Sequence, residues 1–148
     1  MEFDLGGVAK EYAADRAAMA CAEAGAQWLL VNLGGDIRSI DSQPQGEPWR
    51  IGITHPRSAG TIASLDVLQG GVATSGDYER YIEINGTRYS HILDARTGMP
   101  CETMPQAVTV AAPACMVAGS LCTLAMLAGE GARALLDDSG FSDRKSVV

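Results

Sequence analysis

The sequence predicts an α+β fold, a largely antiparallel sheet flanked by a few helices. Several short apolar runs, bounded by glycine, proline or asparagine, have the length of strands. Two of these runs are joined by Asn85-Gly86, the strongest short-range signal of a β-hairpin, so neighbouring strands are expected to run antiparallel. The helical segments are few and do not alternate regularly with the strands, which argues against a doubly wound parallel sheet.

Six segments are predicted to be strands, because each is apolar or alternates apolar with polar residues between turn signals. They are 28–33, 49–54, 61–68, 81–84, 87–92 and 107–111. Residues 41–48 hold Gln, Pro, Gly and Asp and are interpreted as a surface loop. Residues 70–77 combine small residues with hydroxyls and one carboxylate, and on their own they are interpreted as a polar loop.

Three segments are predicted to be helices. The first covers residues 8–24, where alanines surround a modest apolar face, and Gly25 ends it. The second begins with Pro113 in its first turn and lasts to Gly129, and a shorter helix follows at about 131–137.

Inside the second predicted helix, Gly119 and Thr123 lie four residues apart and therefore share a face. A glycine in a helix interior costs about 1 kcal/mol relative to alanine, so its presence requires a reason. Close packing against another backbone is the simplest one.

Residues 1–148 are interpreted as a single domain, since this length and an apolar content of 47% suffice to bury a core. Residues 143–148 complete no predicted element, which indicates a truncated chain. There is no run of about 20 apolar residues of the kind that spans a bilayer. The amino terminus also lacks the charged and apolar regions of a signal peptide.

A formal net charge of −7, without a cluster of Lys and Arg, argues against a nucleic-acid partner. An anionic cofactor on so acidic a chain would have to be met by backbone N–H groups, by one or two placed cations, or by a metal ion. The four cysteines lack CxxC spacing and lie in or beside apolar runs, which favours buried free thiols and leaves a disulfide as the alternative. They are Cys21, Cys101, Cys115 and Cys122.

Residues 4–10, Asp-Leu-Gly-Gly-Val-Ala-Lys, place two glycines at the entrance of the first predicted helix. Backbone N–H groups and the ammonium of Lys10 could approach a phosphate there, although an ordinary glycine-rich turn has the same composition. Residues 32–36, Asn-Leu-Gly-Gly-Asp, are interpreted as a strand end followed by a tight turn.

Residues 90–98, Ser-His-Ile-Leu-Asp-Ala-Arg-Thr-Gly, follow a predicted strand directly. His91 could accept a proton from an attacking hydroxyl, and Arg96 could pair with a carboxylate or a phosphate. A structural role for His91 remains the alternative, and His55 is expected to be structural or exposed.

Five segments in one order together resemble the FAD:protein FMN transferase family, often called ApbE, from residue 4 to about residue 129. They are residues 4–10, 32–36, 74–77 (Thr-Ser-Gly-Asp), 90–98 and 108–113 (Val-Thr-Val-Ala-Ala-Pro). The resemblance implies an ApbE-like fold and a Mg²⁺-dependent enzyme that transfers the FMN portion of FAD to a threonine or serine of a target protein, releasing AMP. Some relatives instead hydrolyse FAD to FMN and AMP.

The resemblance also implies roles for particular residues. His91 is similar to the histidine that helps to deprotonate the acceptor hydroxyl, with Asp94 as its helper. The implied contacts with the flavin nucleotide are Asp4, Lys10 and Leu93, and the implied metal ligands are the carbonyl of Gly7 and the hydroxyl of Thr123.

The sequence departs from the family pattern at three positions. Gly119 stands where an acidic metal ligand is usual, which should weaken Mg²⁺ binding and impair catalysis unless Ser120 or Asp77 substitutes. Glu11 replaces a usual glycine and Ala95 a usual proline, and neither is expected to touch a proposed ligand directly.

Two other functions therefore stay open, a flavin-binding module without transferase activity and an inactive fragment that binds no flavin. The resemblance further implies that this chain is the carboxy-terminal portion of a longer protein. It implies a periplasmic or membrane-anchored location, with any anchor in the missing amino-terminal part.

Overall fold

The computed structural model describes residues 5–78, 80–101, 103–140 and 145–147. In chain order the helices and strands are α1 (Ala9–Glu23), β1 (Leu30–Leu33), β2 (Asp36–Ser39), η1 (Pro44–Gly46), β3 (Trp49–Thr54), β4 (Thr61–Val67), β5 (Gly70–Gly76), β6 (Tyr81–Ile84), β7 (Thr87–Ser90), β8 (Ala107–Ala112), α2 (Cys115–Ala128), η2 (Gly129–Gly131), α3 (Ala132–Asp138) and β9 (Lys145–Val147).

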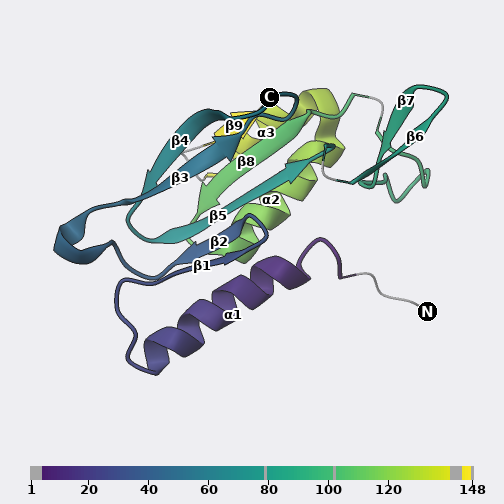
Figure 1. The fold of residues 1–148 in the computed structure, drawn as a ribbon. Coiled ribbons are helices and arrows are strands. Elements are labelled where there is room, and N and C mark those ends of the chain that lie inside the picture. The colour runs from purple at the N-terminus through teal and green to yellow at the C-terminus, as the bar shows by residue number, and fades with distance from the viewer. Residues whose placement is uncertain (1–4, 79, 102, 141–144, 148) are drawn as a thin grey trace.

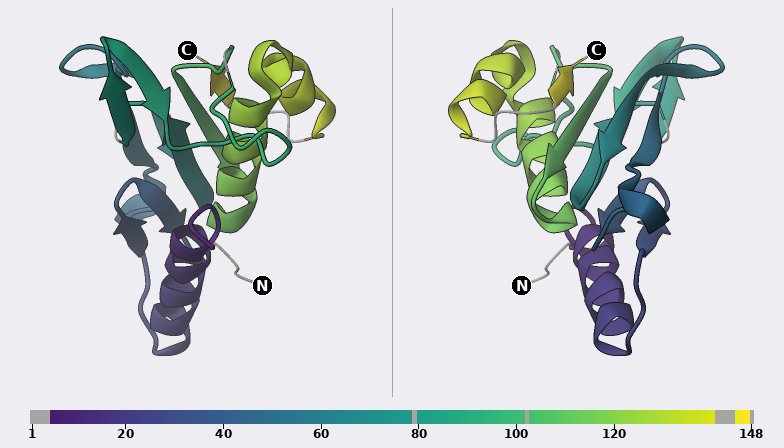
Figure 2. Two further views of the ribbon diagram at one scale, coloured as in Figure 1. Left: turned by 90° about the vertical axis from the view of Figure 1, so that its right-hand side faces the viewer. Right: turned by 90° about the vertical axis from the view of Figure 1, so that its left-hand side faces the viewer.

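The centre of the molecule is a five-stranded sheet in the order β1-β2-β5-β8-β9, in which each neighbouring pair is antiparallel (Figure 1). Two further antiparallel ribbons, β3–β4 and β6–β7, complete the strands of the described residues. Figure 2 shows α2 and α3 on one side of this sheet and the β3–β4 ribbon on the other. The predicted α+β class, with its antiparallel sheet and few helices, is confirmed.

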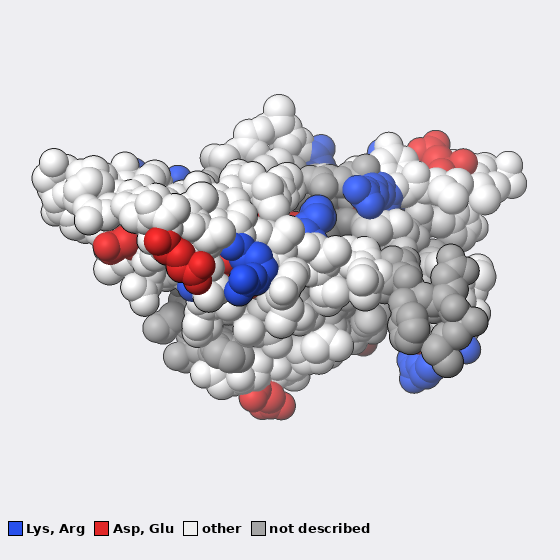
Figure 3. All heavy atoms as spheres, turned by 90° about the horizontal axis from the view of Figure 1, so that it is seen from below, with Lys and Arg blue, Asp and Glu red and all other residues white. Residues whose placement is uncertain are grey.

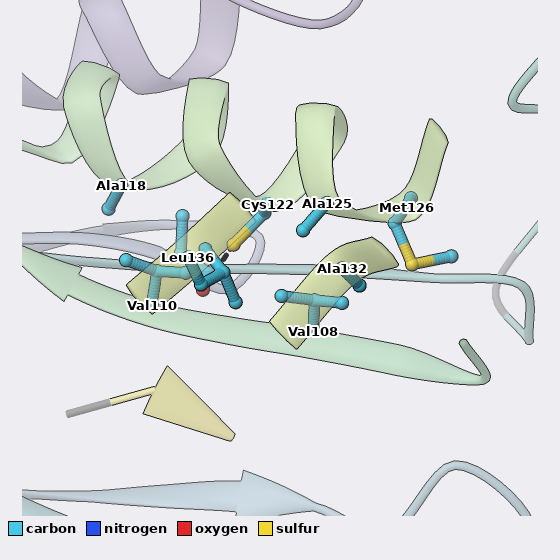
Figure 4. Close-up of a cluster of buried hydrophobic side chains, with 9 residues drawn as sticks. Val108, Val110, Ala118, Cys122, Ala125, Met126, Ala132 and Leu136 are labelled. Atoms are coloured by element: carbon cyan, nitrogen blue, oxygen red, sulfur yellow. Dashed lines mark hydrogen bonds between the residues drawn. The ribbon is translucent and has the colours of Figure 1, made fainter. Parts of the chain in front are cut away.

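Successive residues of the central strand β5 point to opposite faces of the sheet and serve two separate cores. Ala73 packs with the buried face of α2, whereas its neighbour Val72 packs with Ile37, Ile51 and Val67 beneath the β3–β4 ribbon. In the first core the buried side chains of α2 point toward β8 (Figure 4). The members of that core are Ala73, Val108, Val110, Ala118, Cys122, Ala125, Met126, Ala132 and Leu136.

Two glycine-containing turns have the geometry that the sequence predicts. Asn85 and Gly86 both have positive φ, at 52° and 79°, as a two-residue hairpin with right-handed strand twist requires. Gly34 and Gly35, with φ of 65° and 98°, join β1 to β2 in the same way. The second hairpin strand is shorter than expected, because β7 ends at Ser90.

Residues 70–77 were the clearest error of the sequence analysis. Their small size indicates a polar loop, yet β5 is the central strand, and the residues that begin it are buried. The reason is steric: a Cβ on Gly71 would lie 2.1 Å from the backbone nitrogen of Cys115. Small residues are needed where the start of α2 crosses this strand, so their presence does not indicate a turn.

Three further elements differ from expectation. β2 was not predicted, and residues 145–147 form a short edge strand beside β8, although no element was expected there. The second helix begins at Cys115, so Pro113 precedes it and does not occupy its first turn. The N–H groups of Cys115 and Met116, which have no partner within the first turn of α2, instead donate to the carboxylate of Asp15 on α1, each at 2.9 Å.

The segment Cys115–Asp138 is long and apolar enough to cross a membrane by length and composition alone, which the sequence analysis did not expect. In the fold, α2 ends at Ala128, and Gly129 turns the backbone with a φ of 58° before α3 begins. The apolar residues that face the sheet form the first core. This placement accounts for the hydropathy of the segment.

Cys21, Cys101, Cys115 and Cys122 are all free, as expected, but Cys21 is exposed and only Cys115 and Cys122 are buried. Burial raises the pKa of the Cys115 and Cys122 thiols to about 12. Both therefore serve as small apolar side chains.

Candidate functional site

Helices α1 and α2 run side by side in opposite directions, and their facing residues are spaced one helical turn apart on each helix. The contacts along this interface are Gly7 with Thr123, Glu11 with Gly119, and Asp15 with Cys115. The aspartate anchors one end by capping α2. The other end therefore has a fixed register, in which the amino-terminal turn of α1 faces the middle of α2.

The two predicted metal ligands meet at this end of the interface. A Cβ on Gly7 would lie 4.0 Å from the hydroxyl oxygen Oγ1 of Thr123. The structure thus brings these two residues together from distant parts of the chain. Asp4, which is predicted to contact the nucleotide, lies outside the described residues.

Lys10 is held by a carboxylate that sequence reasoning did not assign to it. Its Nζ lies 2.6 Å from Oδ2 of Asp36, whose side chain is only 4% exposed, whereas the Lys10 side chain is 51% exposed. Asp36 stands just beyond the Gly34-Gly35 turn, which is closed by a bond of 2.8 Å from the Gly35 N–H to the side-chain oxygen of Asn32. The 32–36 motif was a visible signal, but its spacing does not reveal which cation it meets.

His91 and Leu93 line one cavity of about 610 Å³ beside the β6–β7 ribbon. The remaining lining residues are Arg80, Tyr81, Ile82, Tyr89, Ser90 and Pro100. His91 Nδ1 lies 3.0 Å from the backbone oxygen of Arg80. Because a carbonyl only accepts, Nδ1 must carry the proton in this bond, and Nε2 of the neutral ring is left as a proton acceptor.

Asp94 follows this cavity and is engaged by Arg96. The guanidinium contacts the carboxylate at 2.7 Å, and the Arg96 N–H donates to the same carboxylate at 2.9 Å. These bonds lower the pKa of Asp94 to about 2, so the carboxylate is ionised at neutral pH. The backbone oxygen of Asp94 also accepts from Thr97 and Gly98, which closes the turn.

The predicted site residues thus form two groups in the described part of the chain. Gly7, Lys10 and Thr123 lie at the start of α1, while His91 and Leu93 line the cavity beside the hairpin, with Asp94 next in sequence. No described contact joins the groups, and neither Lys10 nor Thr123 lines that cavity. Both groups lie toward the end of the molecule at which the β6–β7 hairpin projects (Figure 1).

The two side chains that could have replaced the missing acid of α2 are engaged elsewhere. The Ser120 hydroxyl donates to the backbone oxygen of Met116 at 2.8 Å. The carboxylate of Asp77 receives two bonds from Arg57, at 2.7 and 2.6 Å. Neither contact brings an oxygen to Gly119.

Glu11 lies at Gly119, the position of the missing acid, and the expectation that it touches no proposed ligand is not contradicted by this contact. A Cβ on Gly119 would lie 2.5 Å from Cγ and 2.7 Å from Oε1 of Glu11. The absence of a side chain at Gly119 therefore accommodates this carboxylate, and close packing against another backbone is not the reason for the glycine. Sequence reasoning noticed both departures but had no means of pairing them, because the register of the two helices is a tertiary property.

Few charged side chains lie on the face of the molecule that is seen from below in Figure 3. Figure 3 shows Lys and Arg atoms next to Asp and Glu atoms on a mostly uncharged surface. Among the described residues, no three His, Cys, Asp or Glu side chains converge as a metal site. A cation bound by the described residues would therefore depend in part on backbone and hydroxyl oxygens.

Comparison with known proteins identifies relatives over almost the whole chain. The ApbE family matches residues 1–142. FAD:protein FMN transferases from Haemophilus influenzae and Salmonella typhimurium are 37% and 38% identical over 130 and 128 residues. These alignments cover 86% and 85% of this chain but only 38% and 37% of the relatives.

Two solved structures share the fold. An ApbE protein from Thermotoga maritima has a TM-score of 0.89 at 39% identity, and the match covers 99% of this chain and 48% of that one. The apo form of the Pseudomonas stutzeri flavinyl transferase ApbE has a TM-score of 0.80 at 32% identity and covers 99% and 49%. The chain therefore spans about half the length of these proteins or less, and its sequence and fold together show that it belongs to the ApbE family.

Proposed function

We propose that this chain supplies the carboxy-terminal portion of an enzyme that transfers FMN from FAD to a threonine or serine of a target protein and releases AMP. Family membership supports the flavin substrate and the protein acceptor, since the curated relatives are named FAD:protein FMN transferases. The observation that carries the proposal is the approach of Gly7 to Thr123, which brings the two predicted metal ligands together beside the glycine-rich start of α1.

In the proposed reaction the acceptor hydroxyl attacks the phosphorus on the FMN side of the FAD pyrophosphate. A new P–O bond forms, the bond from that phosphorus to the bridging oxygen breaks, and AMP leaves with the bridging oxygen. The hydroxyl proton passes to Nε2 of His91, the nitrogen that the bond between Nδ1 and the Arg80 carbonyl leaves available.

The donor set near α1 fits a hard divalent cation, because Mg²⁺ prefers oxygen ligands and retains several waters. In the proposal the carbonyl of Gly7 and the hydroxyl of Thr123 hold Mg²⁺. When bound, this cation would neutralise charge on the pyrophosphate. The ammonium of Lys10, oriented by Asp36, would serve as a second positive group for the nucleotide.

Leu93 is proposed to contact the flavin nucleotide from the hairpin cavity, which it lines together with His91. Asp94 is proposed to assist His91 by holding the turn beside it in place. Its bonds with Arg96, Thr97 and Gly98 close the turn that follows Leu93, and its ionised carboxylate is a weak base at neutral pH. Asp4 completes the proposed nucleotide contacts.

Incubation of the full-length protein with FAD and Mg²⁺ has three possible outcomes that distinguish the proposed function from its rivals. AMP together with covalently bound flavin on a protein of a cell extract, seen by fluorescence on a denaturing gel, is the expected result. AMP with free FMN alone would indicate a pyrophosphatase. Quenched flavin fluorescence without AMP would indicate a binding module and would contradict the proposal.

The cellular location is also proposed from the family resemblance. We place the protein in the periplasm or at a membrane, held by an anchor in the amino-terminal part. Fractionation of cells that express the full-length protein tests this, and recovery in the cytosolic fraction would contradict it.

A further inference from the structure

The α1–α2 interface holds a buried carboxylate whose role the proposed function does not explain. The Glu11 side chain is 7% exposed, and its Oε2 is buried without a hydrogen-bond partner. A buried carboxylate that lacks partners is unfavourable, because it has lost its hydration without compensation. The carboxylate of Asp15 one turn further along, by contrast, accepts two backbone bonds.

The position of Glu11 relates it to the two predicted metal ligands. It lies four residues after Gly7, which stands in the turn just before α1, and the residue that it faces, Gly119, lies one helical turn before Thr123 on α2. The carboxylate therefore lies between the Gly7–Thr123 contact and the Asp15 cap, and of the two acidic residues at this interface it is the one nearer to Gly7 and Thr123.

We propose that Glu11 supplies the acidic ligand of a divalent-cation site shared with Gly7 and Thr123, so that the carboxylate comes from α1 where α2 carries Gly119. This inference rests on the proposed function for the presence of the cation. A hard cation would compensate the buried Oε2, since carboxylate oxygens are its preferred protein ligands. Considered alone, Gly119 predicts weak Mg²⁺ binding and impaired turnover. If Glu11 supplies the missing carboxylate, neither defect is expected.

The pair also makes a prediction about exchange. An aspartate at position 119 and the Glu11 side chain cannot both keep these positions, because the aspartate Cβ would lie 2.5 Å from Cγ of Glu11, so one of them must shift. Replacing Glu11 by glycine removes that conflict. The acidic group can then be moved from one helix to the other without displacing a side chain if both positions change.

Two simpler roles for Glu11 must be separated from this one. A glutamate in the first turn of α1 interacts favourably with the helix dipole, and its side chain fills the space beside Gly119. Either role affects folding but not the affinity for a cation. Glu11→Gln preserves the shape of the side chain and removes its charge, so cation binding separates the cases.

The experiment measures binding of Mn²⁺, a paramagnetic substitute for Mg²⁺, to the full-length protein by electron paramagnetic resonance, with and without FAD. Glu11→Gln should weaken Mn²⁺ binding at least about tenfold, the scale expected for loss of a group that supports a metal site. The matched control is Glu23→Gln, an exposed glutamate at the other end of α1, which should bind Mn²⁺ as the unmodified protein does.

A second arm follows thermal unfolding. Without metal, Glu11→Gln should unfold no earlier than the unmodified protein, because a buried charge has been removed, but a given Mg²⁺ concentration should raise its midpoint by less. The exchange pair Glu11→Gly with Gly119→Asp should recover Mn²⁺ affinity to within about threefold, a difference of under 1 kcal/mol by the standard conversion. Gly119→Asp alone should not bind better than the unmodified protein.

Unchanged Mn²⁺ affinity in Glu11→Gln, or no Mn²⁺ binding by the unmodified protein even with FAD, would overturn the inference. These results are separable from failure of the proposed function, because they require no turnover. Glu11-dependent Mn²⁺ binding without AMP release would support the cation site and contradict the transferase. Normal AMP release by Glu11→Gln with unaltered Mn²⁺ binding would contradict the role of Glu11 in the cation site and leave the transferase supported.

Discussion

At the scale of single residues, the structure explains how two side chains are oriented by neutral or acidic oxygens. The Arg80 carbonyl fixes the tautomer of His91, and the carboxylate of Asp36 holds the ammonium of Lys10. Neither pairing can be read from the sequence, because neither partner lies in the same motif as the residue that it orients. The motifs name the reactive side chains but not what positions them.

The His91 tautomer leads to a paired substitution. Asparagine can donate to the Arg80 carbonyl much as Nδ1 does, but it offers no counterpart of Nε2. His91→Asn should therefore leave unfolding by urea nearly unchanged while lowering the rate of flavin transfer by about 10²- to 10⁴-fold, the usual contribution of a general base.

His91→Gln is the control, because its amide reaches the Nε2 position and loses the bond with Arg80. It should be inactive as well as less stable. If His91→Asn keeps more than a tenth of the activity, His91 is a structural residue and does not accept the proton.

At the scale of elements, composition predicts strands well where packing demands branched side chains and fails where packing demands small ones. The predicted elements at 49–54, 61–68 and 107–111 match β3, β4 and β8 within a residue at each end. β5 was missed because Gly70 and Gly71 look like a turn. β2, which follows the Gly34-Gly35 turn, was missed because its four residues include only one large apolar side chain.

The close contact between β5 and α2 gives a prediction with an internal comparison. Gly71→Ala should lower the free energy of unfolding by about 3 kcal/mol, because its Cβ would lie 2.1 Å from the Cys115 backbone nitrogen, which cannot move without the helix. Gly52→Ala should cost about 1 kcal/mol or less, since its Cβ would lie 2.9 Å from the Cγ2 of Thr61, the end of a side chain. Urea unfolding of the two variants tests the difference, and equal losses would contradict this account of β5.

The pairing of Glu11 with Gly119 belongs to this scale too. Each departure was visible in the sequence as an isolated difference from the family pattern. Only the antiparallel register of α1 and α2, set by the Asp15 cap, brings them into contact. Such compensation across an interface cannot be inferred from one sequence, because spacing along the chain does not determine which helices pack together.

At the scale of the whole molecule, the buried thiols should make stability depend on alkaline pH. The pKa of Cys115 and of Cys122 is raised from 9.0 to about 12, with burial as the main cause. The folded state therefore keeps its thiol protons at pH values where the unfolded chain loses them. The resulting stability is complete below pH 9 and is lost as the pH rises from 9 to about 12.

The matched variants for this prediction are Cys122→Ala and Cys21→Ser. The first should show a smaller loss of unfolding free energy between pH 9 and 12 than the unmodified protein, because one of the two buried thiols is gone. The second replaces an exposed cysteine and should show the same loss. A pH profile for Cys122→Ala that coincides with that of the unmodified protein would contradict the assignment.

The match to the two solved ApbE structures covers 99% of this chain but only 48% and 49% of theirs. The chain's two groups of predicted site residues lie toward one end of the molecule, at the start of α1 and beside the β6–β7 hairpin. In our account, FAD bound by the full-length protein would bridge these groups, so that its pyrophosphate would meet both the start of α1 and the acceptor hydroxyl beside His91.

The most direct test of this account is a mass spectrum of the acceptor after incubation of the full-length protein with FAD, Mg²⁺ and an acceptor purified from the extract. We predict one FMN on a single threonine or serine for each AMP released, and neither product with Thr123→Ala. Release of AMP with all flavin recovered as free FMN, or an acceptor labelled equally well by Thr123→Ala, would contradict it.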